Sequence, residues 1–206
     1  NYICSMIKAY KYKLKPNENQ KTFFEKSFGC TRFVYNWALS KRIEAYQQEK
    51  KRLSCVDLCK MLTFLKKEED KLWLNEVSTE CLQQSIRNMD SAFTRFFREK
   101  EGFPKFKSKK DSRKSYKAIN NVKVDFGSNR IKLPKIGWVS FYKNRTFEGK
   151  IGTVTVTKTA TGKYYVSVLV DDGKETPKKP DIKYDTTVGI DVGIKDFAVL
   201  SNGQVY

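Results

Sequence analysis

The segments GTVTVTKT (residues 152–159) and KYYVSVLV (residues 163–170) alternate β-branched or aromatic side chains with more polar ones. A period of two residues is typical of a strand that buries one face. Between the segments stand Ala160, Thr161 and Gly162, a spacing and a composition that suit a hairpin loop. The pair predicts an antiparallel hairpin, and the two-residue period after residue 118 predicts a sheet built from the later part of the chain.

A second alternating stretch stands near the start of the chain, at residues 7–15 (IKAYKYKLK). Apolar and basic side chains take turns along it, which predicts another half-buried strand. One face of that strand is cationic and carries Lys11, Lys13 and Lys15.

Between these regions the apolar residues recur every three or four positions, the spacing of helices packed on a core. A first helical stretch begins after Asn17, and Gly29 is expected to divide it into two helices. Ser54 opens a segment that resembles a capping box, and Ser78 begins another helix. About four helices are therefore predicted between residues 17 and 101.

The order of strands, inserted helices and further strands predicts an α+β fold. The segment GKETPKKPDIKYD is rich in proline and charge and has no periodicity, so we expect a surface linker and a domain boundary there. The predicted divisions are a discontinuous β domain at 6–16 and 118–172, a helical domain with a basic C-terminal segment at 17–117, the linker at 173–185 and the start of a further domain at 186–206.

The chain is strongly basic, with 41 Lys and Arg against 23 Asp and Glu, a net charge of +18 and a pI near 9.6. Such an excess favours a polyanionic partner, nucleic acid before an anionic membrane, and the alternative is a merely solvated surface. No apolar run reaches the roughly 18 residues of a membrane span, and no signal-peptide pattern opens the chain. We expect a cytoplasmic, nucleoid-associated protein with no membrane partner.

Histidine is absent, and the five cysteines lack the Cys-x-x-Cys spacing of a zinc site. Without histidine, the usual Ser-His and Cys-His nucleophile pairs are excluded. Cys55 and Cys59 stand four apart in a helical stretch, where small core residues explain them better than metal ligands do. Any chemistry is therefore expected to use carboxylates and a metal ion.

The segment VGIDVGIKDFAVLSNG (residues 188–203) places Asp191 in a predicted strand between Gly189 and Gly193. A hard cation such as Mg²⁺ prefers carboxylate oxygen, and glycines let phosphate oxygens approach the backbone, so Asp191 is the candidate metal ligand. One alternative is a solvent-facing Asp on an edge strand. Another is the phosphate loop of an actin-like ATPase, which is disfavoured because Ile194 follows instead of Thr or Ser.

Residues 94–117 (TRFFREKEGFPKFKSKKDSRKSYK) hold ten Lys or Arg against three acids, with aromatic rings between them. Basic side chains neutralise phosphates and rings stack on bases, so this run suits the backbone of RNA or of an RNA–DNA heteroduplex. The alternative is a solvated loop with a few core phenylalanines. The candidate nucleic-acid-binding residues of the run are Lys105, Lys107, Lys109, Lys110, Arg113, Lys114 and Tyr116.

Six blocks of the sequence, in this order, resemble successive blocks of the TnpB, or OrfB-type, transposon proteins, which are related to the small type V CRISPR effectors. The resemblance runs from about residue 6 to residue 203. The blocks are KAYKYKLKPNENQ, GCTRFVYNWAL, LWLNEVSTECLQQSIRNMDSAFTRFF, GFPKFKSKK, IKLPKIGWV and GIDVGIKDFAVLSNG.

The resemblance implies that the discontinuous β domain is a wedge-like antiparallel β-barrel with a helical recognition domain inserted into it. It also implies that residues from about 186 are the first strands of an RNase H-like (RuvC) nuclease domain. The later catalytic carboxylates and a zinc-binding module are then expected after Tyr206. This portion alone is not expected to cut DNA, because phosphodiester hydrolysis needs several carboxylates around the metal.

The function that the resemblance implies is that of an RNA-guided, Mg²⁺-dependent DNA endonuclease, with a guide RNA and double-stranded target DNA as partners. Asp191 matches the family's first catalytic carboxylate and is expected to be both catalytic and metal-binding. The candidates for reading the target duplex are Gln83, Arg87, Asn120 and Asn121. Alternatives are a nuclease-dead guided repressor and another transposon DNA-binding protein.

Overall fold

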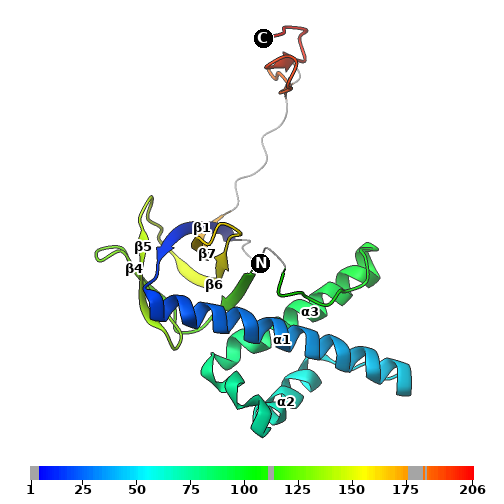
Figure 1. Ribbon diagram of the computed structural model, residues 1–206. Helices are drawn as coiled ribbons and strands as arrows, with labels where there is room; N and C mark the ends of the chain where they lie inside the picture. Colours follow the sequence, from blue (N-terminus) through cyan, green and yellow to red (C-terminus); the bar gives the residue numbers. More distant parts are fainter. Residues whose placement is uncertain (1–4, 111–113, 176–182, 184) are drawn as a thin grey trace. The chain divides into compact units, whose positions relative to one another are not determined.

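The chain forms two compact units, of which the first is Ser5–Lys174 and the second includes Glu175–Tyr206 (Figure 1). The division between them falls inside the predicted linker at 173–185. No described helix is both long enough and apolar enough to cross a bilayer. The computed structural model describes residues 5–110, 114–175, 183 and 185–206.

The described part of the first unit contains three α-helices and one 3-10 helix. Two of the α-helices begin with a capping box, formed by Asn17 with Gln20 and by Ser54 with Asp57, and the second box confirms the prediction at Ser54. Each box satisfies backbone N–H groups that a helix start otherwise leaves unpaired. The helices are α1 (Glu18–Glu49), α2 (Cys55–Leu65), η1 (Glu69–Glu76) and α3 (Thr79–Glu99).

The break expected at Gly29 is wrong, because α1 continues through it as one helix of 32 residues. A glycine inside a helix costs about 1 kcal/mol relative to alanine. On either side of it, Phe24, Phe28 and Val34 are buried in the core that α1 shares with α3 and the sheet. Burying each large apolar side chain contributes about 1.5–3 kcal/mol, so packing outweighs the glycine penalty.

Seven strands form one sheet in the order β2-β6-β7-β1-β5-β4-β3. The predicted hairpin is confirmed, since β6 and β7 pair antiparallel with Val156 opposite Val166. Gly162 in the hairpin loop has a φ of 76°, a conformation that favours glycine. The strands are β1 (Ser5–Lys15), β2 (Lys114–Ala118), β3 (Lys123–Asp125), β4 (Arg130–Leu133), β5 (Gly137–Tyr142), β6 (Lys150–Lys158) and β7 (Tyr164–Glu175).

The sheet is open, so the α+β class is confirmed but the closed wedge-like barrel is not found. Strands β2 and β3 are the two edges, and no pairing among the described residues joins them. Closing a barrel requires strands of matched length and stagger around the whole circumference. Here the sheet ends at two short strands of five and three residues, each paired on one side only among the described residues.

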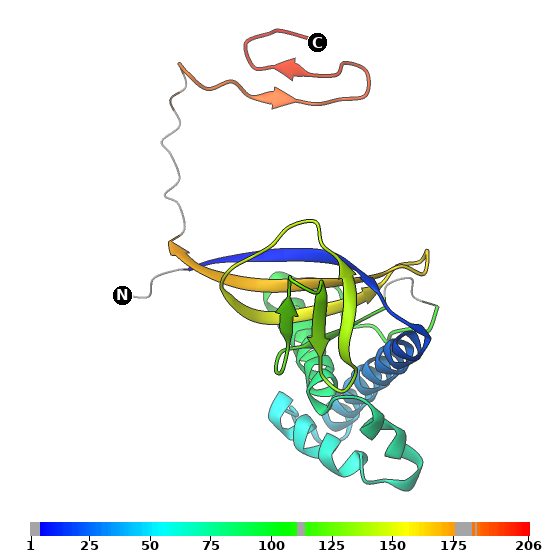
Figure 2. The same ribbon diagram turned by 90° about the vertical axis from the view of Figure 1, so that its left-hand side faces the viewer.

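Helices and sheet share one hydrophobic core. In both ribbon views the helices gather to one side of the sheet (Figures 1 and 2). Phe24 on α1 is fully buried, with its ring centroid 5.6 Å from that of Tyr164 on β7 and 6.2 Å from that of Tyr116 on β2. The predicted β domain and helical domain are therefore joined through common packing.

The second unit contains a short antiparallel pair of strands, β8 (Ile190–Asp191) and β9 (Val199–Leu200). Ile190, Val192 and Ile194 are all exposed. A two-stranded pair is marginal by itself in water, and this one buries few apolar side chains. An RNase H-like domain as a whole is not present among the described residues.

Replacing Phe24 with alanine is expected to lower the free energy of unfolding by about 3–5 kcal/mol, because it removes the ring that contacts Tyr116 and Tyr164. Urea denaturation followed by circular dichroism measures the change. Phe64→Ala is the control, since Phe64 on α2 is 68% exposed, and its effect should stay below about 0.5 kcal/mol. Equal losses in the two variants would contradict a central role for Phe24.

Candidate nucleic-acid interface

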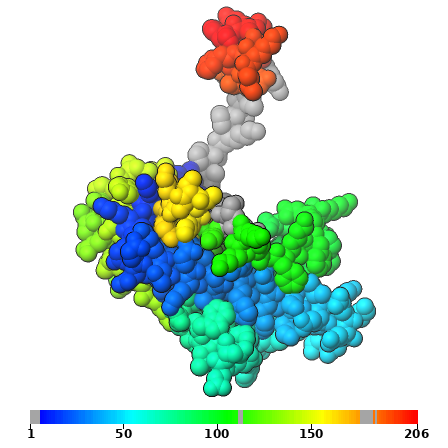
Figure 3. All heavy atoms as spheres, viewed as in Figure 1, coloured from blue at the N-terminus to red at the C-terminus, as the bar shows by residue number. Residues whose placement is uncertain are grey.

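The stretch between α3 and β2, residues 100–113, is here called the basic segment, and its described part, residues 100–110, lies beside α1 (Figures 1 and 3). Asn36 on α1 holds it with two hydrogen bonds to the backbone of Lys107. The N–H of Lys107 donates to Oδ1 of Asn36 at 2.8 Å, and Nδ2 of Asn36 donates to the Lys107 carbonyl at 2.9 Å. Nζ of Lys107 lies 4.0 Å from the centroid of the Tyr35 ring. This segment is therefore fixed to the helical core at Lys107.

A cleft of about 520 Å³, here called the polar cleft, lies between α1, α3, the basic segment and β2. No carboxylate is found in its described lining, and four side chains are cationic. These are Arg32, Lys107, Lys114 and Lys117. The rest of the lining is mainly neutral and polar: Phe28, Thr31, Ser85, Asn88, Ser108, Ser115 and Tyr116.

Glu25 on α1 positions two lysines beside the polar cleft. Its carboxylate lies 2.6 Å from Nζ of Lys158 and 3.5 Å from Nζ of Lys114, and it accepts a hydrogen bond from the Tyr164 hydroxyl at 3.1 Å. Burial opposes ionisation of Glu25, but the hydrogen bonds from Lys158 and Tyr164 and the nearby positive charges outweigh it and lower its pKa. Glu25 therefore stays ionised and anchors β2 and β6 to the helix.

Tyr116 does not have the stacking role that the sequence predicted. Its side chain is buried, with ring centroids 6.2 Å from Phe24 and 5.9 Å from Phe28. Burial raises the pKa of its hydroxyl far above the ordinary value. The ring belongs to the core because it is on the inward face of β2, where the alternation along the strand places every second side chain.

The other candidates of the basic run fall into two groups. Lys107 and Lys114 line the polar cleft, whereas Lys105, Lys109 and Lys110 are exposed and lie outside its lining. Arg113 lies outside the described residues. The structure thus brings only some of the predicted cations together at one site.

The four duplex-reading candidates lie on α3 and the loop after β2. Gln83 is half-buried in α3, and Arg87 is exposed one turn further along. The backbone N–H of Asn120 donates to both carboxylate oxygens of Glu80, at 3.1 and 3.2 Å, which ties this loop to the first turn of α3. Asn121 has a φ of 57°. None of the four lines the polar cleft.

A second basic and aromatic surface, on the sheet, was missed by sequence reasoning. The alternation at residues 7–15 predicted a cationic face but not its aromatic partners, which belong to distant strands. Trp138 and Tyr142 on β5 are exposed. Three cations lie over exposed or half-buried rings here: Lys11 at 4.7 Å from the Tyr165 centroid, Lys13 at 5.2 Å from Tyr142 and Arg130 at 5.8 Å from Trp138.

Asp191 is the exposed last residue of β8, opposite Val199. A metal ion or a phosphate can reach such a carboxylate. Across the part of the chain that the structure describes, however, no three His, Cys, Asp or Glu residues gather into a possible metal site. Asp191 can therefore supply one ligand, but the described residues do not by themselves complete a Mg²⁺ site.

One comparison matches part of the chain to a known sequence family. Residues 6–51 match HTH_OrfB_IS605, which is described as a helix-turn-helix domain. In this structure the matched residues form strand β1 and the single uninterrupted helix α1.

Two relatives match almost the whole chain. "Putative RNA-guided DNA endonuclease InsQ" of Escherichia coli (strain K12) is 31% identical over 200 residues, covering 97% of this chain and 48% of that protein. "Putative RNA-guided DNA endonuclease" of Streptomyces pristinaespiralis is 33% identical over 200 residues, covering 96% and 48%. The chain thus spans about half the length of both. "Virulence protein VsdF" of Salmonella dublin is 33% identical over 113 residues, covering 50% of this chain and 95% of that protein.

Replacing Glu25 with glutamine is expected to lower the free energy of unfolding at neutral pH by less than about 1 kcal/mol, because its ion pairs with Lys158 and Lys114 are partly exposed. The pKa of Glu25 is lowered in the folded protein. Its stabilising contribution is therefore present above the ordinary value of 4.5 and is lost as the pH falls through the lower folded value.

Urea denaturation of both proteins from neutral pH to about pH 2 measures this difference, which should shrink toward zero in acid. The control is Glu148→Gln, an exposed residue that enters no ion pair within the described part of the chain. A constant difference between wild type and Glu25→Gln across the series would contradict the assignment.

Proposed function

The chain belongs to the TnpB, or OrfB-type, family of transposon proteins, and from this we propose that it is the nucleic-acid-binding portion of an RNA-guided DNA endonuclease. The observation that carries the proposal is the polar cleft, whose described lining has four cations and no carboxylate. The net charge of +18 adds a wider attractive field for a polyanion. Both features favour nucleic acid as the ligand.

The polar cleft is proposed to hold the backbone of a guide RNA paired with DNA. Lysine and arginine neutralise phosphates and release counterions without reading sequence. In RNA-guided recognition, base pairing reads the sequence, and the protein holds the heteroduplex through its backbone and A-form shape. Lys105, Lys109, Lys110 and Arg113 extend the proposed contact along the basic segment.

Double-stranded target DNA is the second proposed partner, read by Gln83, Arg87, Asn120 and Asn121. The bond between Asn120 and Glu80 supports this, because it holds the loop after β2 close to the start of the helix that carries Gln83. A glutamine amide can pair with the two major-groove groups of adenine. These contacts are proposed to act in the cytoplasm, on DNA of the nucleoid.

Cleavage is proposed to require a RuvC-type domain that begins near residue 186, with Asp191 as one ligand of Mg²⁺. The exposure of Asp191 supports this role. When bound, such a metal activates water and stabilises the charge that develops on the phosphate. The other carboxylates, and a zinc-binding module, are proposed for the half of the relatives' length that this chain does not span. A nuclease-dead guided repressor, or another transposon DNA-binding protein, would share every basic feature.

Neutralising three cations of the polar cleft in Arg32→Gln/Lys107→Gln/Lys117→Gln should weaken binding to a 20-base-pair RNA–DNA heteroduplex. The slope of the logarithm of the binding constant against the logarithm of the salt concentration should become shallower by about 0.7–0.9 for each lost phosphate contact, roughly 2–3 in total. Fluorescence anisotropy over a salt series measures both quantities.

The matched control removes the same charge at three exposed lysines that do not line the cleft: Lys60→Gln/Lys67→Gln/Lys163→Gln. It should lower affinity only through net charge. Equal slopes for the two triple variants would show that the polar cleft is an ordinary solvated surface.

In the full-length protein, Asp191→Asn should slow Mg²⁺-dependent DNA cleavage by about 1,000-fold or more, because it removes one metal ligand, while guided DNA binding stays within about twofold. Asp196→Asn, at an exposed position in the same hairpin, is the control and should cut at the wild-type rate. Undiminished cleavage by Asp191→Asn would remove this residue from the mechanism. A wild-type protein that binds but never cuts would favour the repressor.

A further inference from the structure

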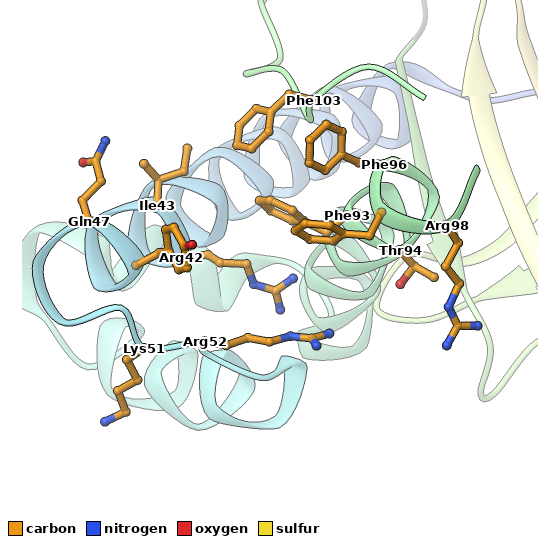
Figure 4. Close-up of a pocket in the computed structure, with 12 residues that line it drawn as sticks. Arg42, Ile43, Gln47, Lys51, Arg52, Phe93, Thr94, Phe96, Arg98 and Phe103 are labelled. Carbon is orange, nitrogen blue, oxygen red and sulfur yellow. The ribbon is translucent and has the colours of Figure 1, made fainter. Parts of the chain in front are cut away.

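A second cavity, of about 700 Å³, lies between the later part of α1, the loop after it and the end of α3 (Figure 4). Its described lining combines aromatic and cationic side chains and includes no carboxylate. We propose that this aromatic cavity binds one unstacked nucleotide of a single-stranded nucleic acid, a site that rests on the proposed function and adds unpaired strand to its ligands. The residues that carry the inference are Arg42, Tyr46, Arg52, Phe93, Phe97 and Phe103.

The walls of the aromatic cavity offer ring faces to a ligand. Tyr46, Phe97 and Phe103 line it and remain 60%, 70% and 49% exposed. Phe97 stacks on Phe93 with ring centroids 6.3 Å apart and an interplanar angle of 20°. Exposed apolar patches that surround a cavity mark ligand or interaction sites. A flat base covers such rings by stacking, whatever its identity.

Arg42 adds a buried positive charge to the lining of the cavity, which favours an anionic ligand. Its side chain is 7% exposed, and its Cζ lies 5.1 Å from the centroid of the Phe93 ring. Nη2 lies 2.7 Å from Oδ1 of Asp90, an ion pair by distance that partly neutralises the charge. Its geometry makes no hydrogen bond, however, and neither Nε nor Nη2 has a hydrogen-bond partner within the described residues. Both atoms are shielded from solvent, so Arg42 acts on a ligand in the cavity through its positive charge and not through a direct hydrogen bond.

Charge decides which class of ligand fits. Lys51, Arg52 and Arg98 accompany Arg42 in the lining, so a purely apolar peptide would leave these cations without partners. Figure 4 shows Arg42 and Arg52 extending in the same direction, while Lys51 points away from the other side chains. A nucleotide offers both a flat ring and a phosphate, and the volume lies within the range of small-ligand pockets.

The aromatic cavity and the polar cleft are close along the basic segment. Phe103 lines the first and Lys107 lines the second. Four residues span at most about 14 Å of extended chain, so these two side chains stand near each other. One nucleic acid can therefore occupy both, with paired strand in the polar cleft and an unpaired nucleotide between the rings.

The test uses a 15-nucleotide single-stranded RNA that contains 2-aminopurine, and the RNA–DNA heteroduplex described above. Phe97→Ala should weaken binding of the single strand about 5- to 150-fold, the usual effect of losing one base–aromatic stack. It should also reduce the quenching of 2-aminopurine on binding, and heteroduplex affinity should stay within about twofold. Phe64→Ala, which removes an equally exposed ring on α2, is the matched control and should change neither.

If Phe97→Ala proves unstable in urea denaturation, a second variant tests the same cavity. Arg52→Gln removes an exposed cation of the cavity and should flatten the salt dependence of single-strand binding by about 0.7. The heteroduplex slope should not change.

Three outcomes would overturn the inference. Single-strand binding that neither variant alters would exclude the cavity, even with the heteroduplex bound normally. A concentration-dependent dimer that Phe97→Ala abolishes, with unchanged RNA binding, would show that a second copy of the chain covers the rings. If the unaltered protein bound neither probe, the proposed function would fail together with the cavity, whereas failure of the single strand alone leaves the polar cleft intact.

Discussion

The burial of helix α1 between the sheet and α3 is the constraint on which the rest of the first unit depends. Near its start Phe24 enters the sheet core, twelve residues later Asn36 holds the basic segment, and six residues after that Arg42 reaches the aromatic cavity. At 1.5 Å per residue these positions stand about 18 Å and 9 Å apart along one axis. Because the helix is uninterrupted, core, polar cleft and aromatic cavity keep a fixed spacing.

The scarce carboxylates of this basic protein hold its own elements in place. Glu25 joins α1 to Lys114 and Lys158 on the sheet, Asp90 pairs with Arg42, and Glu80 accepts the Asn120 backbone. Neither the polar cleft nor the aromatic cavity has a carboxylate in its described lining. Because these carboxylates are paired within the protein, the polar cleft and the aromatic cavity both remain cationic. A bound polyanion would relieve the repulsion among these charges and stabilise the folded state by mass action.

The sequence predicts those features of the fold that depend only on residues close together in the chain. The β6–β7 hairpin and the capping box at Ser54 follow from alternation and side-chain reach, and both are confirmed. The helix break predicted at Gly29 was wrong because the packing of the residues around it outweighs the cost of a glycine inside a helix. A stacking role was predicted for Tyr116 because it stands in a run of basic residues, but the residue is on the inward face of strand β2. The aromatic partners of Lys11 and Lys13 belong to strands more than a hundred residues away, and no local pattern contains that pairing.

The continuous helix α1 also limits which surfaces can make the proposed contacts with nucleic acid. A helix-turn-helix places its second helix in the major groove, which requires two helices and a free recognition face. Here the residues that match a helix-turn-helix family form one helix, and ten of its side chains, from Phe24 to Arg42, are buried. Those positions are committed to the core and cannot also contact base edges. The proposed contacts with nucleic acid therefore fall to side chains of α1 outside the core, such as Arg32 in the polar cleft, and to elements that α1 supports. Those elements are the basic segment after α3, the loop after β2 and the cationic face of the sheet.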